Sequence, residues 1–106
     1  MIRKAFYMEL KPGRLEAYVK AHNPIPRELA AALKRCGVSN YSIFCHADRN
    51  VLICVFEADD EEKLAGLADC ECCRVWWKEM TENLVVAVRG DEKAREEPMT
   101  EVFYLQ

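Results

Sequence analysis

The chain has 106 residues, of which 51% are hydrophobic and 31% charged, and its formal net charge is −3. This length and composition predict one globular domain spanning residues 1–106, and they exclude a disordered chain. The small negative charge gives no electrostatic reason to expect nucleic acid or an anionic membrane as a partner.

The N-terminal sequence MIRKAFYMEL alternates and carries charges, so we expect neither a signal peptide nor a membrane anchor there. No apolar run approaches the ~20 residues that span a bilayer. The sequence therefore predicts a cytoplasmic protein whose six cysteines are free thiols.

The first third of the chain predicts a strand followed by two helices. Residues 2–10 alternate in the way that is typical of a strand. Residues 14–22 follow with apolar side chains at helical spacing. Asn23 and Pro24 are expected to end this helix and to begin a second one over 24–35, as its N-cap and first helical residue.

The middle of the chain predicts a β-hairpin. Residues 38–47 and 50–58 are strand candidates with a short polar connection between them. The second strand contains VLICVF, which is apolar on both faces and therefore typical of the centre of a sheet that is covered on both sides. A chain of this length has helices for only one face, so we expect a partner subunit to cover the other.

The last third predicts helical regions over 59–68 and 70–82, a polar loop over 87–98 and a final strand over 99–105. The complete order is strand, helices, two strands, helices, strand. This is the ferredoxin-like βαββαβ arrangement, an α+β fold with an antiparallel sheet and its helices on one face.

One of the two histidines is a candidate for chemistry. Tyr18 and His22 lie four residues apart, so on a helix they point the same way and can bind one small ligand; packing at the sheet edge is the alternative. His22 also lies at its helix end, where the dipole favours positive charge. We therefore expect its pKa to rise above the reference of about 6.5, as suits a general acid. His46 lies beside the hairpin turn and is expected at the surface.

Two aromatic residues are adjacent on a predicted helix. Trp76 and Trp77 point about 100° apart there, so their rings cannot share one burial site. One ring can fill the core while the other lines a pocket, where an aromatic face stacks well on a sugar. The alternative is that both rings pack in the core or in an interface between subunits.

A cysteine-rich stretch contains one C-x-x-C pattern. A zinc site built on Cys70, Cys72 and Cys73 would need further ligands at similar spacing, and no second pair exists. A redox motif would need a thioredoxin-like context, which is missing. We interpret these cysteines as small hydrophobic side chains and expect no metal site.

Six short matches, in order over nearly the whole chain, resemble the L-rhamnose mutarotase family. They are M-I-R-K-A-F at the start, Tyr18 with His22-Asn23-Pro24-Ile25, Asn40-Tyr41, Arg49-Asn50, Trp76-Trp77-Lys78-x-Met80, and Glu101-Val102-Phe103-Tyr104-Leu105. The resemblance implies a homodimeric α+β barrel in which two ferredoxin-like subunits pack sheet to sheet. It also implies an isomerase that interconverts the α and β anomers of a deoxy sugar such as L-rhamnose by acid–base ring opening.

The resemblance assigns roles to five residues. His22 is implied as the proton donor, and Tyr18, Tyr41, Trp76 and Trp77 are implied to line the sugar site, with no cofactor and no metal. The chain departs from the family at Pro26-Arg27, where Trp-Pro is usual, so a large aromatic is missing near the pocket mouth. The cysteines of 70–73 and the charged loop of 87–98 are further departures.

Two other functions are compatible with the same fold, because a fold does not fix a function. The first is a small monooxygenase of the dimeric α+β barrel type, which a bound chromophore or oxygen uptake would indicate. The second is a non-catalytic dimeric metabolite-binding module, which would bind its ligand without accelerating anomer exchange.

Overall fold

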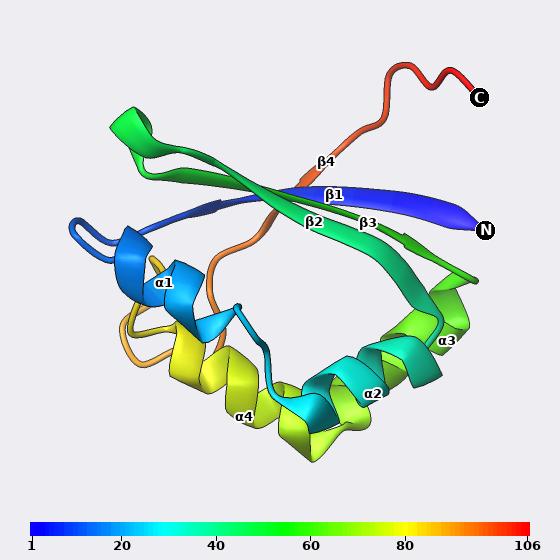
Figure 1. Cartoon of the computed structure of the whole chain (residues 1–106), viewed down its shortest axis with the longest axis horizontal. Coiled ribbons are helices and arrows are strands. Elements are labelled where there is room, and N and C mark those ends of the chain that lie inside the picture. The colour runs from blue at the N-terminus through cyan, green and yellow to red at the C-terminus, as the bar shows by residue number, and fades with distance from the viewer.

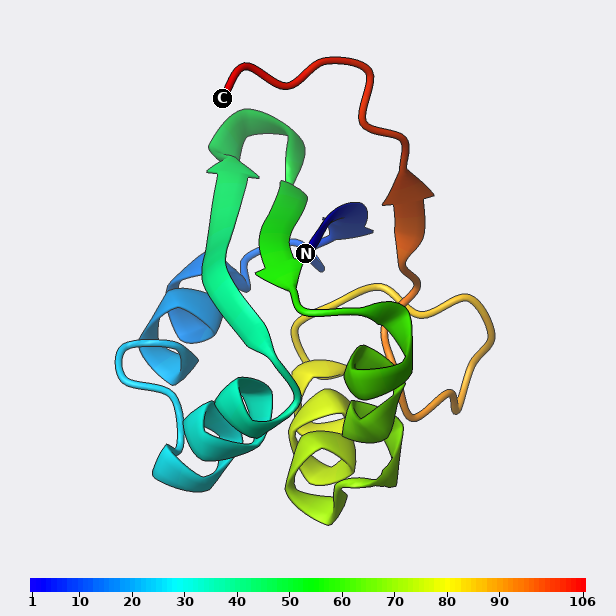
Figure 2. The same ribbon diagram turned by 90° about the vertical axis from the view of Figure 1, so that its right-hand side faces the viewer.

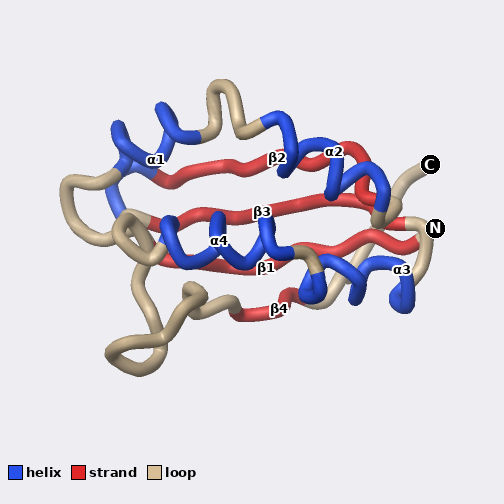
Figure 3. The backbone as a smooth tube through the Cα atoms, turned by 90° about the horizontal axis from the view of Figure 1, so that it is seen from below, coloured by secondary structure: helices blue, strands red, loops and turns tan.

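One antiparallel sheet with the strand order β2-β3-β1-β4 organises the computed structural model, which describes residues 1–106. In chain order the elements are β1 (Ile2–Glu9), α1 (Leu15–Ala21), α2 (Arg27–Arg35), β2 (Val38–His46), η1 (Ala47–Arg49), β3 (Val51–Ala58), α3 (Glu61–Ala65), η2 (Gly66–Asp69), α4 (Glu71–Met80) and β4 (Glu97–Met99). The four α-helices lie on one face of the sheet, and the short helix η1 lies at the tip of the β2–β3 hairpin (Figures 1 and 3). The predicted ferredoxin-like α+β fold is confirmed.

The strand over 51–58 lies between β1 and β2, as its apolar sequence predicts. Every second residue of β3 is buried beneath the helices: these are Leu52, Cys54, Phe56 and Ala58. The intervening residues are only half-buried, because no helix covers the opposite face of the sheet (Figure 1).

Clusters of buried hydrophobic side chains hold the helices against the sheet and against one another. Met8, Leu52 and Met80 belong to a cluster between the sheet, α1 and α4. Leu29 and Cys73 belong to a second cluster, in which α2 packs against α4. These helices therefore form one wall of the molecule and the sheet forms the other. None of the helices combines the length and the apolar composition needed to cross a membrane.

The second helix begins later than the sequence predicts. The expectation that Asn23 caps it and Pro24 occupies its first turn is wrong, because α2 begins at Arg27 with Pro26 in the N-cap position. A residue before proline avoids the α conformation, and both Asn23 and Ile25 precede prolines. Residues 22–26 therefore form a connection, in which the Asn23–Pro24 peptide bond is cis.

A β-bulge interrupts β2 near its start. Between Ser39 and Ser42, β2 advances by three residues while β3 advances by two, and Asn40 adopts a left-handed φ of 50°. One extra residue reverses the alternation of the side chains that follow it. The bulge therefore turns Tyr41 toward the helices, on the same face as Ile43.

The C-terminal strand is much shorter than the sequence predicts. The strand expected over 99–105 is wrong beyond Met99, and β4 begins at Glu97 inside the expected loop. Only three residues of β4 pair with β1. Beyond them the chain leaves the sheet on the helix-free side (Figures 1 and 2). Glu101 binds the Arg3 guanidinium through two side-chain hydrogen bonds of 2.7 Å, which replace further backbone pairing.

Candidate active site

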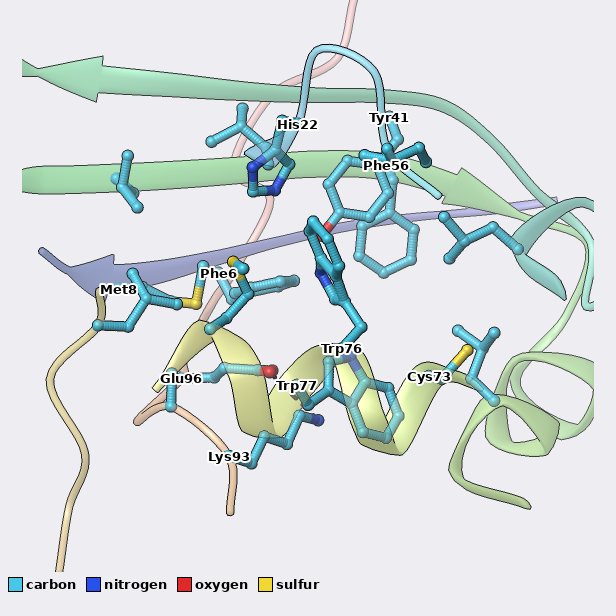
Figure 4. A pocket seen from close by; sticks show the side chains of 18 of the residues that line it. Phe6, Met8, His22, Tyr41, Phe56, Cys73, Trp76, Trp77, Lys93 and Glu96 are labelled. Carbon is cyan, nitrogen blue, oxygen red and sulfur yellow. Dashed lines mark ion pairs between the residues drawn. The ribbon is translucent and has the colours of Figure 1, made fainter. Parts of the chain in front are cut away.

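A cleft of about 810 Å³ lies between the sheet and the helices (Figure 4). Hydrophobic side chains account for 25 of its 31 lining residues. All five sequence-predicted site residues line it: Tyr18, His22, Tyr41, Trp76 and Trp77. Concave, mostly apolar pockets with a few polar groups are the usual form of small-molecule sites.

Three aromatic rings from two helices form the centre of the cleft. The ring of Tyr18 stacks on that of His22, with centroids 4.3 Å apart and planes inclined by 28°. Trp76 approaches His22 edge to face, at 5.1 Å and 80°. The i, i+4 spacing on α1 produces the first contact, and the packing of α4 beside α1 produces the second. The imidazole is thus held between a phenol and an indole.

One hydrogen bond fixes the tautomer of His22. Its Nδ1 atom lies 2.8 Å from the backbone carbonyl oxygen of Tyr18. A carbonyl oxygen only accepts, so the proton of the neutral ring must be on Nδ1. The Nε2 atom is then left with a free lone pair, and a neutral imidazole in this state accepts a proton rather than donating one.

The protonation of His22 is opposite to the sequence-based expectation. Burial in the apolar cleft lowers the pKa of its imidazole below the ordinary value, and the hydrogen bond to the Tyr18 carbonyl opposes this effect only in part. The expected rise from the helix dipole is therefore wrong. The dipole acts weakly at the end of a helix of seven residues, whereas the loss of hydration acts directly on the charged ring.

Both tyrosines of the cleft stay protonated. Burial raises the pKa of Tyr18 and of Tyr41 well above the ordinary value, and the negative charge of Glu96 contributes in the same direction. Two neutral phenols near neutral pH can donate hydrogen bonds to the oxygens of a ligand, but they are poor acids.

The bulge in β2 determines the position of Tyr41. Its ring stacks on Phe56 at 5.0 Å with an interplanar angle of 9°. The residue is 40% exposed, yet its ring points into the cleft from the sheet wall, opposite Trp76 (Figure 4). Tyr41 and Trp76 therefore occupy facing walls, between which a flat ligand can lie.

Two charged residues at the cleft are not predictable from the sequence pattern. Lys93 and Glu96, both in the charged loop of 87–98, line it and form an ion pair of 3.1 Å. The Lys93 ammonium also lies 4.3 Å from the centroid of the Trp77 ring (Figure 4). The loop has no periodicity from which these contacts could be inferred. The pairing of β4 with β1 brings the loop of 87–98 back across the cleft.

The structure also places His46, Pro26 and the cysteines near residue 70, for which expectations came from the sequence. His46 is exposed at the hairpin, as expected. Pro26 does not line the main cleft; it lies in a smaller groove beside Cys70 and Cys72. In this smaller groove, hydrogen bonds from the Cys72 thiol and from the backbone of Cys73 lower the pKa of the Cys70 thiol to about 7.

Comparisons with known proteins identify the family of the chain. The family model for L-rhamnose mutarotase matches residues 3–105. The L-rhamnose mutarotases of Escherichia coli O8 (strain IAI1) and Shigella flexneri are each 42% identical over 105 residues, and each match covers 99% of both chains. The chain belongs to the L-rhamnose mutarotase family.

A solved structure extends the family assignment to the fold. The crystal structure of the L-rhamnose mutarotase from Formosa agariphila superposes with a TM-score of 0.87 at 33% identity, and the match covers 100% of both chains. Members of the L-rhamnose mutarotase family are carbohydrate isomerases, so the expectation of an isomerase is confirmed. The sequence-based preference for a mutarotase over a monooxygenase or a binding module is confirmed as well.

Proposed function

We propose that the chain interconverts the α and β anomers of L-rhamnose, or of a closely related deoxy sugar, with His22 as the acid–base group. The observation that carries this proposal is the arrangement at the centre of the cleft. A neutral imidazole with a fixed tautomer stacks on Tyr18 and meets Trp76 edge to face, in apolar surroundings. Family membership supports the choice of reaction and of sugar.

The reaction needs only proton transfers and one bond rotation. The C1 hydroxyl of the pyranose loses a proton, the bond between C1 and the ring oxygen breaks, and the ring oxygen gains a proton. The aldehyde then rotates about the C1–C2 bond and the ring closes on its other face. Positioned acid–base groups typically accelerate such steps by about 10²–10⁴-fold.

His22 can serve in both halves of ring opening. Its Nε2 lone pair accepts the proton of the C1 hydroxyl, because the Tyr18 carbonyl holds the other proton on Nδ1. The ring oxygen is bonded to the same carbon atom as that hydroxyl, so the imidazolium just formed can return the proton to the ring oxygen. Ring closure reverses these transfers. The two phenols would orient the sugar by donating hydrogen bonds.

The lining of the cleft suits a deoxy sugar. A 6-deoxy hexose carries a methyl group where other hexoses carry a hydroxymethyl group, and a hydroxyl buried without a partner costs free energy. Trp76 and the Tyr41 ring offer aromatic faces to the C–H groups of the pyranose from opposite walls. Lys93 and Glu96 supply polar partners for hydroxyl groups.

We further propose that the enzyme is a homodimer that joins through the helix-free face of the sheet, and that it works in the cytoplasm. On that face Phe44 is 63% exposed, and it pairs with Ile53, which pairs in turn with Tyr7. A second copy offers the same apolar row and closes a barrel. Six free cysteines are compatible with a reducing compartment.

Substitution of His22 tests the proposed reaction. We expect His22→Ala to lower kcat/KM for anomer exchange by about 10²–10⁴-fold, because the acid–base group is lost. The measurement is saturation-transfer NMR between the α and β signals of L-rhamnose, with the uncatalysed rate subtracted. A panel of other deoxy sugars and of hexoses with a hydroxymethyl group, under the same conditions, identifies the preferred substrate.

The exposed histidine supplies the matched control. His46→Ala removes the same side chain at the hairpin and is expected to leave exchange unchanged. Near-normal exchange in a folded His22→Ala variant would refute the role of His22. Sugar binding without any acceleration in the unmodified protein would refute catalysis altogether.

A further inference from the structure

The cysteines at the start of α4 differ from one another in burial. Cys73 is 1% exposed and packs with Leu29 and Ala32, as a small hydrophobic side chain would. Cys70 and Cys72 are only partly buried, and their sulfur atoms lie 3.0 Å apart. The Sγ atoms of all three cysteines lie within 4.8 Å of one another. Packing alone does not require three sulfur atoms to converge.

Charged residues of both signs lie around these sulfur atoms. Cys70 and Cys72 line a small groove between α2 and α4, together with Glu28, Glu71 and Glu79. The guanidinium of Arg35 donates a hydrogen bond of 4.0 Å to the Cys70 sulfur, which stabilises the thiolate form that a metal binds. Cys70 is the N-cap residue of α4, so its side chain lies near the positive end of the helix dipole, although it makes no capping hydrogen bond.

The spacing of the sulfur atoms is close to that of a metal site. With metal–sulfur bonds of about 2.3 Å, tetrahedral zinc holds its sulfur ligands about 3.8 Å apart. Cys70 and Cys72 would separate by less than about 1 Å to reach this value, which side-chain rotation at a partly exposed helix end allows. The fourth coordination position of the metal would face the groove between α2 and α4, where a carboxylate or water can complete the coordination.

We propose that Cys70, Cys72 and Cys73 form a binding site for a soft divalent cation of the zinc and cadmium class. Thiolate ligands select such cations over magnesium or calcium. Each thiol gives up its proton as its metal–sulfur bond forms. Three thiolates and one dication carry a single negative charge, which Arg35 offsets. Cys70 and Cys72 line the smaller groove, whereas Cys73 also borders the main cleft, so the site joins the two cavities without including His22, Tyr18 or Tyr41.

Titration of the reduced protein with Cd²⁺ alone tests the proposal. We expect a thiolate-to-cadmium charge-transfer absorption that saturates at one cation per chain, accompanied by release of protons. Cd²⁺ is the softer cation, so it should displace Zn²⁺ from the zinc-loaded protein and produce the same band. Cys70→Ser/Cys72→Ser should lose the band, whereas the control Cys36→Ser, which removes a partly buried thiol outside the cluster, should keep it.

A second measurement keeps the test independent of folding defects. Zn²⁺ should slow the alkylation of Cys70 and Cys72 at least about tenfold in the unmodified protein, while the exposed Cys45 reacts at an unchanged rate. Peptide mass spectrometry assigns each modified site. Absence of the cadmium band, its survival in the double variant, or equal protection of Cys45 would each overturn the proposal.

Discussion

At the scale of single residues, the proposed chemistry depends on the protonation of His22. The carbonyl of Tyr18 holds a proton on Nδ1, and burial lowers the pKa of the ring. The neutral form with a free Nε2 lone pair is therefore the resting state near neutral pH. The proposed mechanism accordingly uses His22 first as a base, and only afterwards as an acid.

This state predicts the direction of the pH profile. We expect kcat/KM for anomer exchange to be constant near neutral pH and to fall as the solution is acidified through the folded-state pKa of His22, which lies below about 6.5. The reason is that protonation of Nε2 removes the acceptor for the C1 hydroxyl proton. NMR exchange rates, corrected at each pH for the uncatalysed reaction, give the profile.

If His22 acted instead as an acid with a raised pKa, the dependence of anomer exchange on pH would be the opposite. Activity would then be highest in acid and would fall as the pH rose above about 6.5. Titration of the His22 ring carbon proton by NMR provides an independent reading. A midpoint for His22 above about 6.5 would contradict the structural account.

Spacing alone could predict that Tyr18 and His22 share one side of a helix, and the structure stacks their rings. The sign of the pKa shift could not be predicted from the sequence, because it depends on how much apolar surface surrounds the ring. Lys93 and Glu96 could not be predicted either, because only the folded chain carries that loop across the cleft.

At the scale of elements, the bulge in β2 connects the backbone to the site. Asn40 has a φ of 50°, and its amide donates a hydrogen bond of 2.7 Å to the Glu57 carboxylate. Asparagine tolerates the left-handed conformation better than most residues, whereas a β-branched residue is strained there. The sequence resemblance includes Asn40-Tyr41, but only the structure gives the reason: the first residue turns the second into the cleft.

Substitution at the bulge should therefore affect both stability and sugar binding. We expect Asn40→Val to cost about 1–2 kcal/mol of unfolding free energy. We also expect it to raise KM by about 3–10-fold, the equivalent of one hydrogen bond to the sugar, because Tyr41 is displaced. Thermal unfolding measures the first effect, and NMR exchange over a range of sugar concentrations measures the second.

A second asparagine supplies a matched control. Asn50 has a φ of 54° at the hairpin but does not line the cleft. Asn50→Val should therefore lower Tm to a similar extent and leave KM unchanged. An equal rise of KM in both variants would mean that general loosening of the sheet, rather than the position of Tyr41, controls sugar binding.

At the scale of the whole molecule, alternation and helical spacing were sufficient to predict the order of the elements and the central position of β3. They failed at the C-terminus because alternation reports which faces of a segment are apolar, not whether a neighbouring strand is present. Val102, Phe103 and Leu105 are between 76% and 93% exposed. These residues and the bare sheet face lie on the same side of the molecule (Figures 1 and 2).

A charge placed on the bare face tests the proposed dimer. Ile53 lies in the central strand between Tyr7 and Phe44, so Ile53→Lys would place an ammonium group in the middle of an apolar interface without touching the helix-covered core. Burying an unpaired charge costs several kcal/mol, enough to dissociate a dimer of ordinary affinity. In sedimentation velocity we expect about twice the chain mass of 12.2 kDa for the unmodified protein and a single chain for this variant. Glu62→Lys, an exposed substitution on α3, should leave the dimer intact. A monomeric unmodified protein, or a dimer that Ile53→Lys leaves unchanged, would exclude association through this face.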